Sequence, residues 1–132
     1  MSKVYIQKTS PDTVLDDYKR LMDTANYKDH FPKEQKTLLK LNLSWSKFFP
    51  ACSSPPWQLE GVLKTMINDG FNPRDLFACE NRTVVTNIAR GLKGNRWAPI
   101  IKKYGAWFLP LTRIPFVRSE EHTSELQSLL II

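Results

Sequence analysis

The residues that could carry chemistry collect in two polar clusters, each of which follows a short apolar run. The first cluster offers an ammonium, an amide, a thiol and three hydroxyls, and the second a carboxylate, an amide, a guanidinium and a hydroxyl. Amide donors and a planar guanidinium suit carboxylates and phosphates, so the clusters predict a site for a small anionic metabolite. The candidate ligand-binding residues are Lys40, Asn42, Ser44, Cys52, Ser53, Ser54, Glu80, Asn81, Arg82 and Thr83.

Two of these residues could take part in a reaction. Cys52 comes just before a predicted helix start, where a thiol can become a nucleophile; the alternative is a small side chain packed beneath Phe48 and Phe49. Glu80 could act as a general base or a metal ligand, and the alternative is a carboxylate that caps a loop. A metal site would need a second carboxylate or a histidine nearby, and the sequence places none there. Whether the protein is an enzyme, and which cofactor it would use, stays open.

The helix start at Ser54 and Pro55 also favours an anion. A hydroxyl cap followed by proline is typical of a first helical turn, whose free amides and dipole attract negative charge. Two prolines remove amide donors, so this site is weaker than a glycine-rich phosphate loop. The sequence contains no GxGxxG, Walker or GxSxG pattern, which argues against the common nucleotide-binding and hydrolase classes.

Strands alternating with helices must position these clusters. The alternation of Val4 and Ile6 with polar neighbours predicts a strand at 3–8, and apolar runs predict strands at 38–41, 76–79 and 106–109. Helical spacing predicts a helix that begins at 9–12, a second that begins at 54–55 and ends at Gly70, and a short helix over 97–104 that is stopped by Gly105. Gly91 and Gly94 indicate a flexible loop. The order predicts an α/β fold with a largely parallel, Rossmann-like sheet of about four short strands and crossover helices. Ligands of such sheets bind at the carboxyl ends of the strands, where both clusters lie.

The aromatic residues of the first loop, Trp45, Phe48 and Phe49, are predicted to pack on the core, with stacking on a substrate as the alternative. His30 is predicted to be an exposed loop residue, because no acidic or nucleophilic group adjoins it in a catalytic pattern. Cys79 lies within an apolar run and is predicted to be a core residue.

Length and composition describe one globular domain. The chain has 132 residues, of which 42% are hydrophobic, and no apolar run is long enough to span a bilayer. The N-terminus lacks the apolar stretch of a secretory signal, and two cysteines form no disulfide framework, so a cytoplasmic location is predicted. The net charge of +6 comes from scattered basic residues, which favours an ordinary solvated surface over a nucleic-acid groove.

The last residues are predicted to be a non-native tail. Residues 118–128 read RSEEHTSELQS and match, letter for letter, the translation of a widely used sequencing-library adapter. The stretch has no apolar face and reverses the charge of what precedes it. We therefore predict a single α/β domain over residues 1–117 and a tail over 118–132 that takes no part in function.

Parts of the chain resemble the uncharacterised domain-of-unknown-function family 362. The resemblance rests on TLLKLNLSW, CSSPPWQLEGVLKTMINDGF, ENRTVVTN and KKYG, and includes the Lys-x-Asn pattern at Lys40–Asn42. It implies an α/β fold with the site after that strand, and a truncated domain, because the family domain is longer than this chain. Some relatives carry iron–sulfur segments; this chain has no CxxCxxC run and cannot supply four thiolates.

The function expected from these features is the binding of a small anionic ligand at the strand ends, with or without catalysis. A non-catalytic accessory module, such as an electron-transfer partner subunit, is the alternative. Nucleic-acid binding through Arg82, Arg90, Lys93 and Arg96 is a third and weaker reading. No membrane partner is expected.

Overall fold

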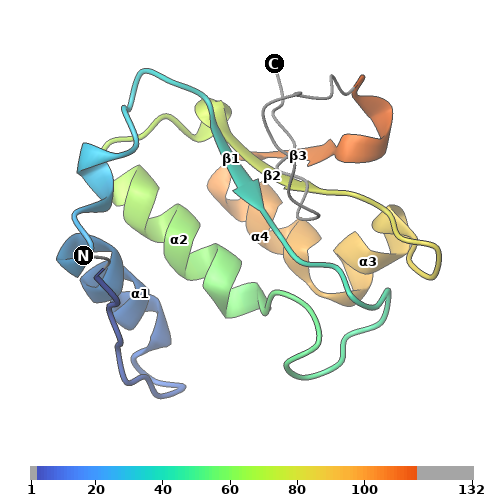
Figure 1. The fold of residues 1–132 in the computed structure, drawn as a ribbon, viewed down its shortest axis with the longest axis horizontal. Coiled ribbons are helices and arrows are strands. Elements are labelled where there is room, and N and C mark those ends of the chain that lie inside the picture. Colours follow the sequence, from blue (N-terminus) through green and yellow to red (C-terminus); the bar gives the residue numbers. More distant parts are fainter. Residues whose placement is uncertain (1–2, 116–132) are drawn as a thin grey trace.

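The computed structural model describes residues 3–115 as a three-stranded sheet with four α-helices (Figure 1). The strands are β1 (Thr37–Lys40), β2 (Leu76–Glu80) and β3 (Trp107–Pro110). The helices are α1 (Val14–Thr24), α2 (Pro56–Asn68), α3 (Ile88–Gly94) and α4 (Trp97–Tyr104). Short 3-10 turns occupy Tyr27–Asp29, Pro73–Asp75 and Leu111–Arg113. The boundary predicted at residue 117 and the tail predicted at 118–132 lie outside the described residues.

All three strands are parallel and lie in chain order, β1-β2-β3. Each connection between them contains a helix, as parallel pairing requires. Figure 1 shows α4 passing behind the strands and α2 beside β1, with α1 on the far side of α2. The α/β prediction is therefore confirmed.

The two faces of the sheet differ in their cover. Leu39, Ala78 and Phe108 occupy one row of the register and pack against the core formed with α2 and α4. Leu38, Phe77 and Trp107 form the next row and therefore point to the opposite face. Leu38 and Trp107 are exposed, and the Arg74 guanidinium lies 5.3 Å from the Trp107 ring centre.

The prediction of a strand at residues 3–8 is wrong. This segment has no strand hydrogen bonding, and Val4 and Ile6 are 83% and 91% exposed. Two aliphatic side chains provide too small an apolar face to hold a strand in place. The sheet of the described residues accordingly has three strands rather than four.

Two glycines end their helices as predicted. Gly70 follows α2 with φ +94°, and Gly105 follows α4 with φ +70°, in the left-handed region that glycine tolerates best. Gly91 and Gly94, by contrast, were expected in a flexible loop and lie inside α3. No helix in the described part of the chain is long and apolar enough to cross a membrane.

Candidate functional site

The carboxyl ends of the strands carry two loops that pack against each other. The β1–α2 loop (residues 41–55) and the β2–α3 loop (residues 81–87) are joined by a hydrogen bond of 2.9 Å from the Asn87 backbone amide to Ser46 Oγ. Asn95, which is 1% exposed, donates its amide to the Trp45 carbonyl at 3.0 Å. The buried Trp97 indole donates to the Ser54 carbonyl at 2.8 Å. The first loop is thus fixed to the α3–α4 corner.

Gly91 and Gly94 explain how the first loop reaches α3. A methyl group at Gly91 would overlap the Leu43 side chain, and one at Gly94 would overlap the Ser46 carbonyl oxygen. The absence of Cβ atoms lets the loop backbone lie directly against the helix. These glycines therefore serve close approach rather than flexibility.

Glu80 is the buried anchor of this region. Its carboxylate, in a residue 5% exposed, accepts hydrogen bonds from the Lys40 ammonium at 2.6 Å, the Leu43 amide at 2.6 Å and the Asn81 amide at 2.7 Å. Lys40 also donates to the Leu41 carbonyl at 2.7 Å. Glu80 thus closes the start of both loops, which is the role of a capping carboxylate.

The hydroxyls of the first cluster are also engaged in loop hydrogen bonds. Ser53 Oγ accepts from the Ser44 and Trp45 amides, and Ser54 Oγ accepts from the Asn42 amide at 2.9 Å. Asn42 donates its side-chain amide to Ser44 Oγ at 3.0 Å. Ser54 is therefore not the helix cap that its sequence context predicts: Pro55 is the N-cap of α2 and makes no side-chain cap bond.

Neither cysteine is linked to a partner. Cys52 is free and half-buried in the first loop. Cys79 is buried in β2, as predicted, and this burial raises the pKa of its thiol above the ordinary value. Within residues 3–115 no group of three His, Cys, Asp or Glu side chains is placed to hold a metal ion.

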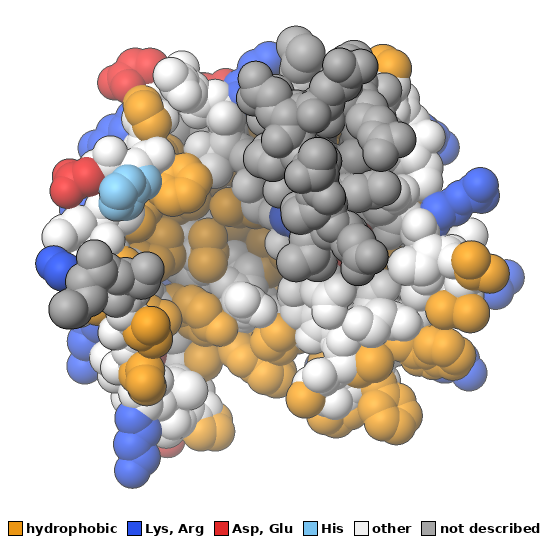
Figure 2. All heavy atoms as spheres, in the orientation of Figure 1, with side chains coloured by type: hydrophobic (Ala, Val, Ile, Leu, Met, Phe, Trp, Pro, Cys, Tyr) orange, Lys and Arg blue, Asp and Glu red, His pale blue; other side chains and the backbone are white. Residues whose placement is uncertain are grey.

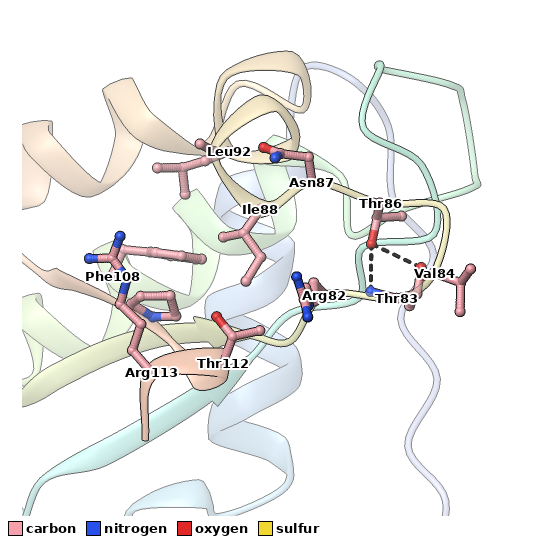
Figure 3. Close-up of a pocket in the computed structure, with 12 residues that line it drawn as sticks. Arg82, Thr83, Val84, Thr86, Asn87, Ile88, Leu92, Phe108, Thr112 and Arg113 are labelled. Atoms are coloured by element: carbon pink, nitrogen blue, oxygen red, sulfur yellow. Dashed lines mark hydrogen bonds between the residues drawn. The ribbon is translucent and has the colours of Figure 1, made fainter. Parts of the chain in front are cut away.

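A groove of about 930 Å³ opens beside these anchors, at the carboxyl ends of β2 and β3 (Figure 3). Its apolar wall comes from Ile88 and Leu92 of α3 and Phe108 of β3. In Figure 3, Arg113 lies near Phe108 on one side and Arg82 lies towards the other, with Thr112 between them in this view. The second loop is held along the groove by Thr86 Oγ1, which accepts from the Thr83 amide at 2.8 Å.

Among the described residues that line the groove, the charged side chains are those of Arg82 and Arg113, which are both positive. Residues 81–115 contain seven Lys and Arg and no Asp or Glu. Arg82 and Arg113 are exposed, and neither forms an ion pair within the described part of the chain. Two guanidinium groups beside an apolar wall suit a ligand with an anionic end and an apolar body.

The ten predicted site residues are divided by this geometry. Arg82 and Thr83 line the groove. Asn81 precedes them and does not line it, and its side-chain oxygen accepts from the Arg82 amide at 2.9 Å. The others hold the loops as described: Lys40, Asn42, Ser44, Ser53, Ser54 and Glu80 by hydrogen bonds, with Cys52 half-buried. Arg113 also lines the groove and was not among the predicted site residues, although it follows a predicted strand in the same way that Arg82 does.

The aromatic residues of the first loop also differ from expectation. Trp45, Phe48 and Phe49 were predicted to pack on the core and are exposed instead. The loop is anchored by its backbone, through Asn95 and Trp97, so its aromatic side chains are not needed for that purpose. His30 is exposed in a loop, as predicted.

Comparison with models of known protein families, with curated proteins and with solved structures finds no match to this chain. The resemblance to family 362 therefore stays a prediction.

Proposed function

We propose that this domain binds a small ligand with an anionic group and an apolar body, in the groove between α3 and the end of β3. The observation that carries the proposal is the pairing of Arg82 and Arg113 with the wall of Ile88, Leu92 and Phe108. The volume of about 930 Å³ lies within the roughly 300–1,000 Å³ typical of small-molecule sites. Binding at the carboxyl ends of parallel strands is the general rule for open α/β sheets.

The lining favours binding rather than proton transfer. The described residues that line the groove include no carboxylate, histidine, cysteine or lysine, and their polar groups are guanidinium, hydroxyl and amide. Such groups orient and neutralise an anion but do not exchange protons near neutral pH. We therefore propose a binding protein, with any reacting group supplied by the ligand or a partner.

The narrower expectations belong to the same proposal. A Rossmann-like relationship is supported by the parallel strand order, the helical crossovers and the position of the groove. Membership of family 362 is supported by the quoted sequence stretches, and a cytoplasmic location by the cysteine usage.

The test is calorimetric titration with matched ligand pairs, in which an aryl carboxylate is compared with its amide and phenyl phosphate with phenol. The anionic member of a pair should bind at least tenfold more tightly, because a hydrogen bond to a charged group is worth about 1.5–3 kcal/mol. Arg113→Gln and Arg82→Gln should each remove that preference and leave the melting temperature unchanged. Lys8→Gln, which removes an exposed charge outside the groove, is the control.

Equal affinity for the charged and neutral members would contradict the proposal. So would anion binding that survives both arginine substitutions, because the anion would then lie elsewhere on the surface.

A further inference from the structure

The tips of the two loops carry large apolar side chains that lie in solvent. Trp45 is 46% exposed and Phe49 64% in the β1–α2 loop, and Val84 and Val85 are 105% and 67% exposed in the β2–α3 loop. A second pocket, of about 300 Å³, lies between the loops and is lined from both sides by Trp45, Lys47, Val84, Val85 and Arg90. Figure 2 shows hydrophobic side chains along the margin where Figure 1 places these loops.

This clustering requires an explanation. Single exposed apolar residues are ordinary, whereas a group such as Trp45, Val84 and Val85, which line one pocket, marks a surface that binds a protein, a membrane or a ligand. The exposure of these side chains does not come from loosely held loops. The Asn87–Ser46 and Asn95–Trp45 hydrogen bonds fix the position of the two loops relative to each other and to α3. We call Trp45, Phe49, Val84 and Val85, with Lys47 and Arg90, the loop-tip surface.

The charge around the loop-tip surface selects the partner. Residues 41–59 contain no Asp or Glu, and neither do residues 81–115. Lys47 and Arg90 line the pocket between the tips, and Lys93 and Arg96 follow in and after α3. Aromatic and aliphatic tips surrounded by cations match the interface of a bilayer that contains anionic lipids, where tips enter the acyl boundary and cations meet phosphates.

We propose that the loop-tip surface docks this domain on an anionic membrane, with Lys47 and Arg90 against lipid phosphates. Single-stranded nucleic acid, which would also use cations and aromatics, fits less well. The two valines offer no ring to stack on a base, and the Arg96 guanidinium already lies 5.8 Å from the centre of the Phe48 ring. Docking by loop tips requires no spanning helix, and the inference does not depend on the ligand groove.

The experiment is flotation of the full chain with vesicles of phosphatidylcholine alone and of phosphatidylcholine with 30% phosphatidylserine. Binding should be much stronger to the vesicles that contain phosphatidylserine, and this difference should weaken with salt. Lys47→Gln with Arg90→Gln should weaken binding roughly thirtyfold, since each surface cation contributes about 1 kcal/mol. Phe49→Ser with Val84→Ser should abolish flotation.

The controls are matched in chemistry and placed on the N-terminal segment. Val4→Ser with Ile6→Ser removes two aliphatic side chains as exposed as those of the tips, and Lys3→Gln with Lys8→Gln removes two charges. Both controls should float like the parent chain, and all variants should keep its melting temperature.

Three results would overturn the proposal. The first is equal or absent binding to the two kinds of vesicle, and the second is loss of flotation in the controls to the same degree as in the tip variants. The third is binding of a thymidine 20-mer that is lost in the tip variants without any vesicle binding, which would assign the surface to nucleic acid. Because Arg113 lies outside the loop-tip surface, Arg113→Gln should remove the preference for the anionic ligand and leave flotation unchanged.

Discussion

Replacing Glu80 by Gln tests whether a buried carboxylate holds the two site loops in place. The Glu80 carboxylate receives three donors: the Leu43 amide on one oxygen, and the Asn81 amide and Lys40 ammonium on the other. A glutamine side chain keeps one acceptor oxygen and presents an NH₂ group where the second stood. At least one buried donor then faces another donor.

The magnitude follows from the cost of a buried unsatisfied group, about 1–3 kcal/mol, with the loss of a charge-assisted bond in addition. We expect Glu80→Gln to lower the free energy of unfolding by about 2–3 kcal/mol. For a domain of this size that corresponds to a fall in melting temperature of roughly 6–15 °C. Urea unfolding at pH 7 measures the change directly.

The comparison with Lys40 sharpens the test. The side chain of Lys40 is 54% exposed, so its ion pair with Glu80 is screened by solvent and worth about 1 kcal/mol or less. Lys40→Met should therefore cost far less than Glu80→Gln, because the two backbone donors of Glu80 remain satisfied. Glu34→Gln, at an exposed position before β1, is the control and should change nothing.

Lys40→Met could instead destabilise the protein as much as Glu80→Gln. The ion pair, and not the backbone donors, would then hold the loops. Hydrogen exchange gives a second readout: the Leu43 amide should lose its protection in Glu80→Gln well before the core strands do.

Three further predictions concern other anchors of the fold. Gly91→Ala should destabilise the protein in urea unfolding, because the alanine methyl group would overlap the Leu43 side chain. The loss is expected although alanine favours a helix over glycine by about 1 kcal/mol. A gain in stability would show that the β1–α2 loop moves aside. Asn87→Ala should cost about 1 kcal/mol in the same assay, since the Asn87 side chain caps α3, and no change would mean that α3 starts elsewhere. The Tyr27 hydroxyl, 2.7 Å from Asp69, holds the pKa of that carboxyl below its usual value, so its stabilisation is present at pH 7 and lost as the pH falls below about 4. Asp69→Asn should therefore be less stable than the parent chain at pH 7 and approach it at pH 3, and parallel pH curves would contradict this linkage.

The strands were predictable where an apolar run is continuous. The runs at 38–41, 76–79 and 106–109 correspond within a residue to β1, β2 and β3. A continuous apolar run does not alternate, and its short length and the turn residues that bound it identify it as a strand. The strand predicted at 3–8, which is wrong, was based on alternation alone. Alternation indicates which side of a strand could be buried, but not whether another element covers that side.

The helix ends were predictable where a residue's backbone conformation determines them. The prediction was wrong where it depended on a hydrogen bond of a side chain. Gly70 and Gly105 adopt the conformation their position requires, and so they stop α2 and α4. Ser54 has the right type for a cap, yet its hydroxyl accepts from the Asn42 amide across the loop. The Ser54 hydroxyl thus bonds to a residue twelve positions away instead of capping its own helix. The sequence around Ser54 does not indicate this distant partner.

The glycines of α3 show the same limit from the other side. Glycine lowers helix propensity, so Gly91 and Gly94 suggested a loop. Glycine is needed at these two positions because of tertiary packing, since Leu43 and Ser46 lie against the helix where Cβ atoms would be. The candidate site follows from this packing, because the β1–α2 loop meets the β2–α3 loop only if its backbone can pass so close to α3.

The sequence alone could not place Arg113 in the same site as Arg82, because this requires the order of the strands in the sheet. Both residues follow strands, but the sequence leaves open which strands are neighbours. The parallel pairing of β2 with β3 places Glu80 opposite Pro110, and so brings the two segments that follow these strands to the same end of the sheet. Residues 31 positions apart then line one groove, and the positive field of residues 81–115 acts at that point.

That field also gives the groove and the loop-tip surface different salt responses. Charges at exposed positions are screened within about 8 Å at physiological ionic strength, so long-range attraction of any anion to this end of the sheet must weaken as salt is added. A ligand seated between Arg82 and Arg113 keeps its direct hydrogen bonds, because contact distances are shorter than the screening length. A bilayer meets Lys47 and Arg90 through solvent-exposed contacts and holds the tips by apolar burial, which salt does not weaken. Added salt should therefore slow ligand association at the groove with little change in dissociation, whereas on vesicles it should lower the affinity to a floor set by Trp45, Phe49, Val84 and Val85.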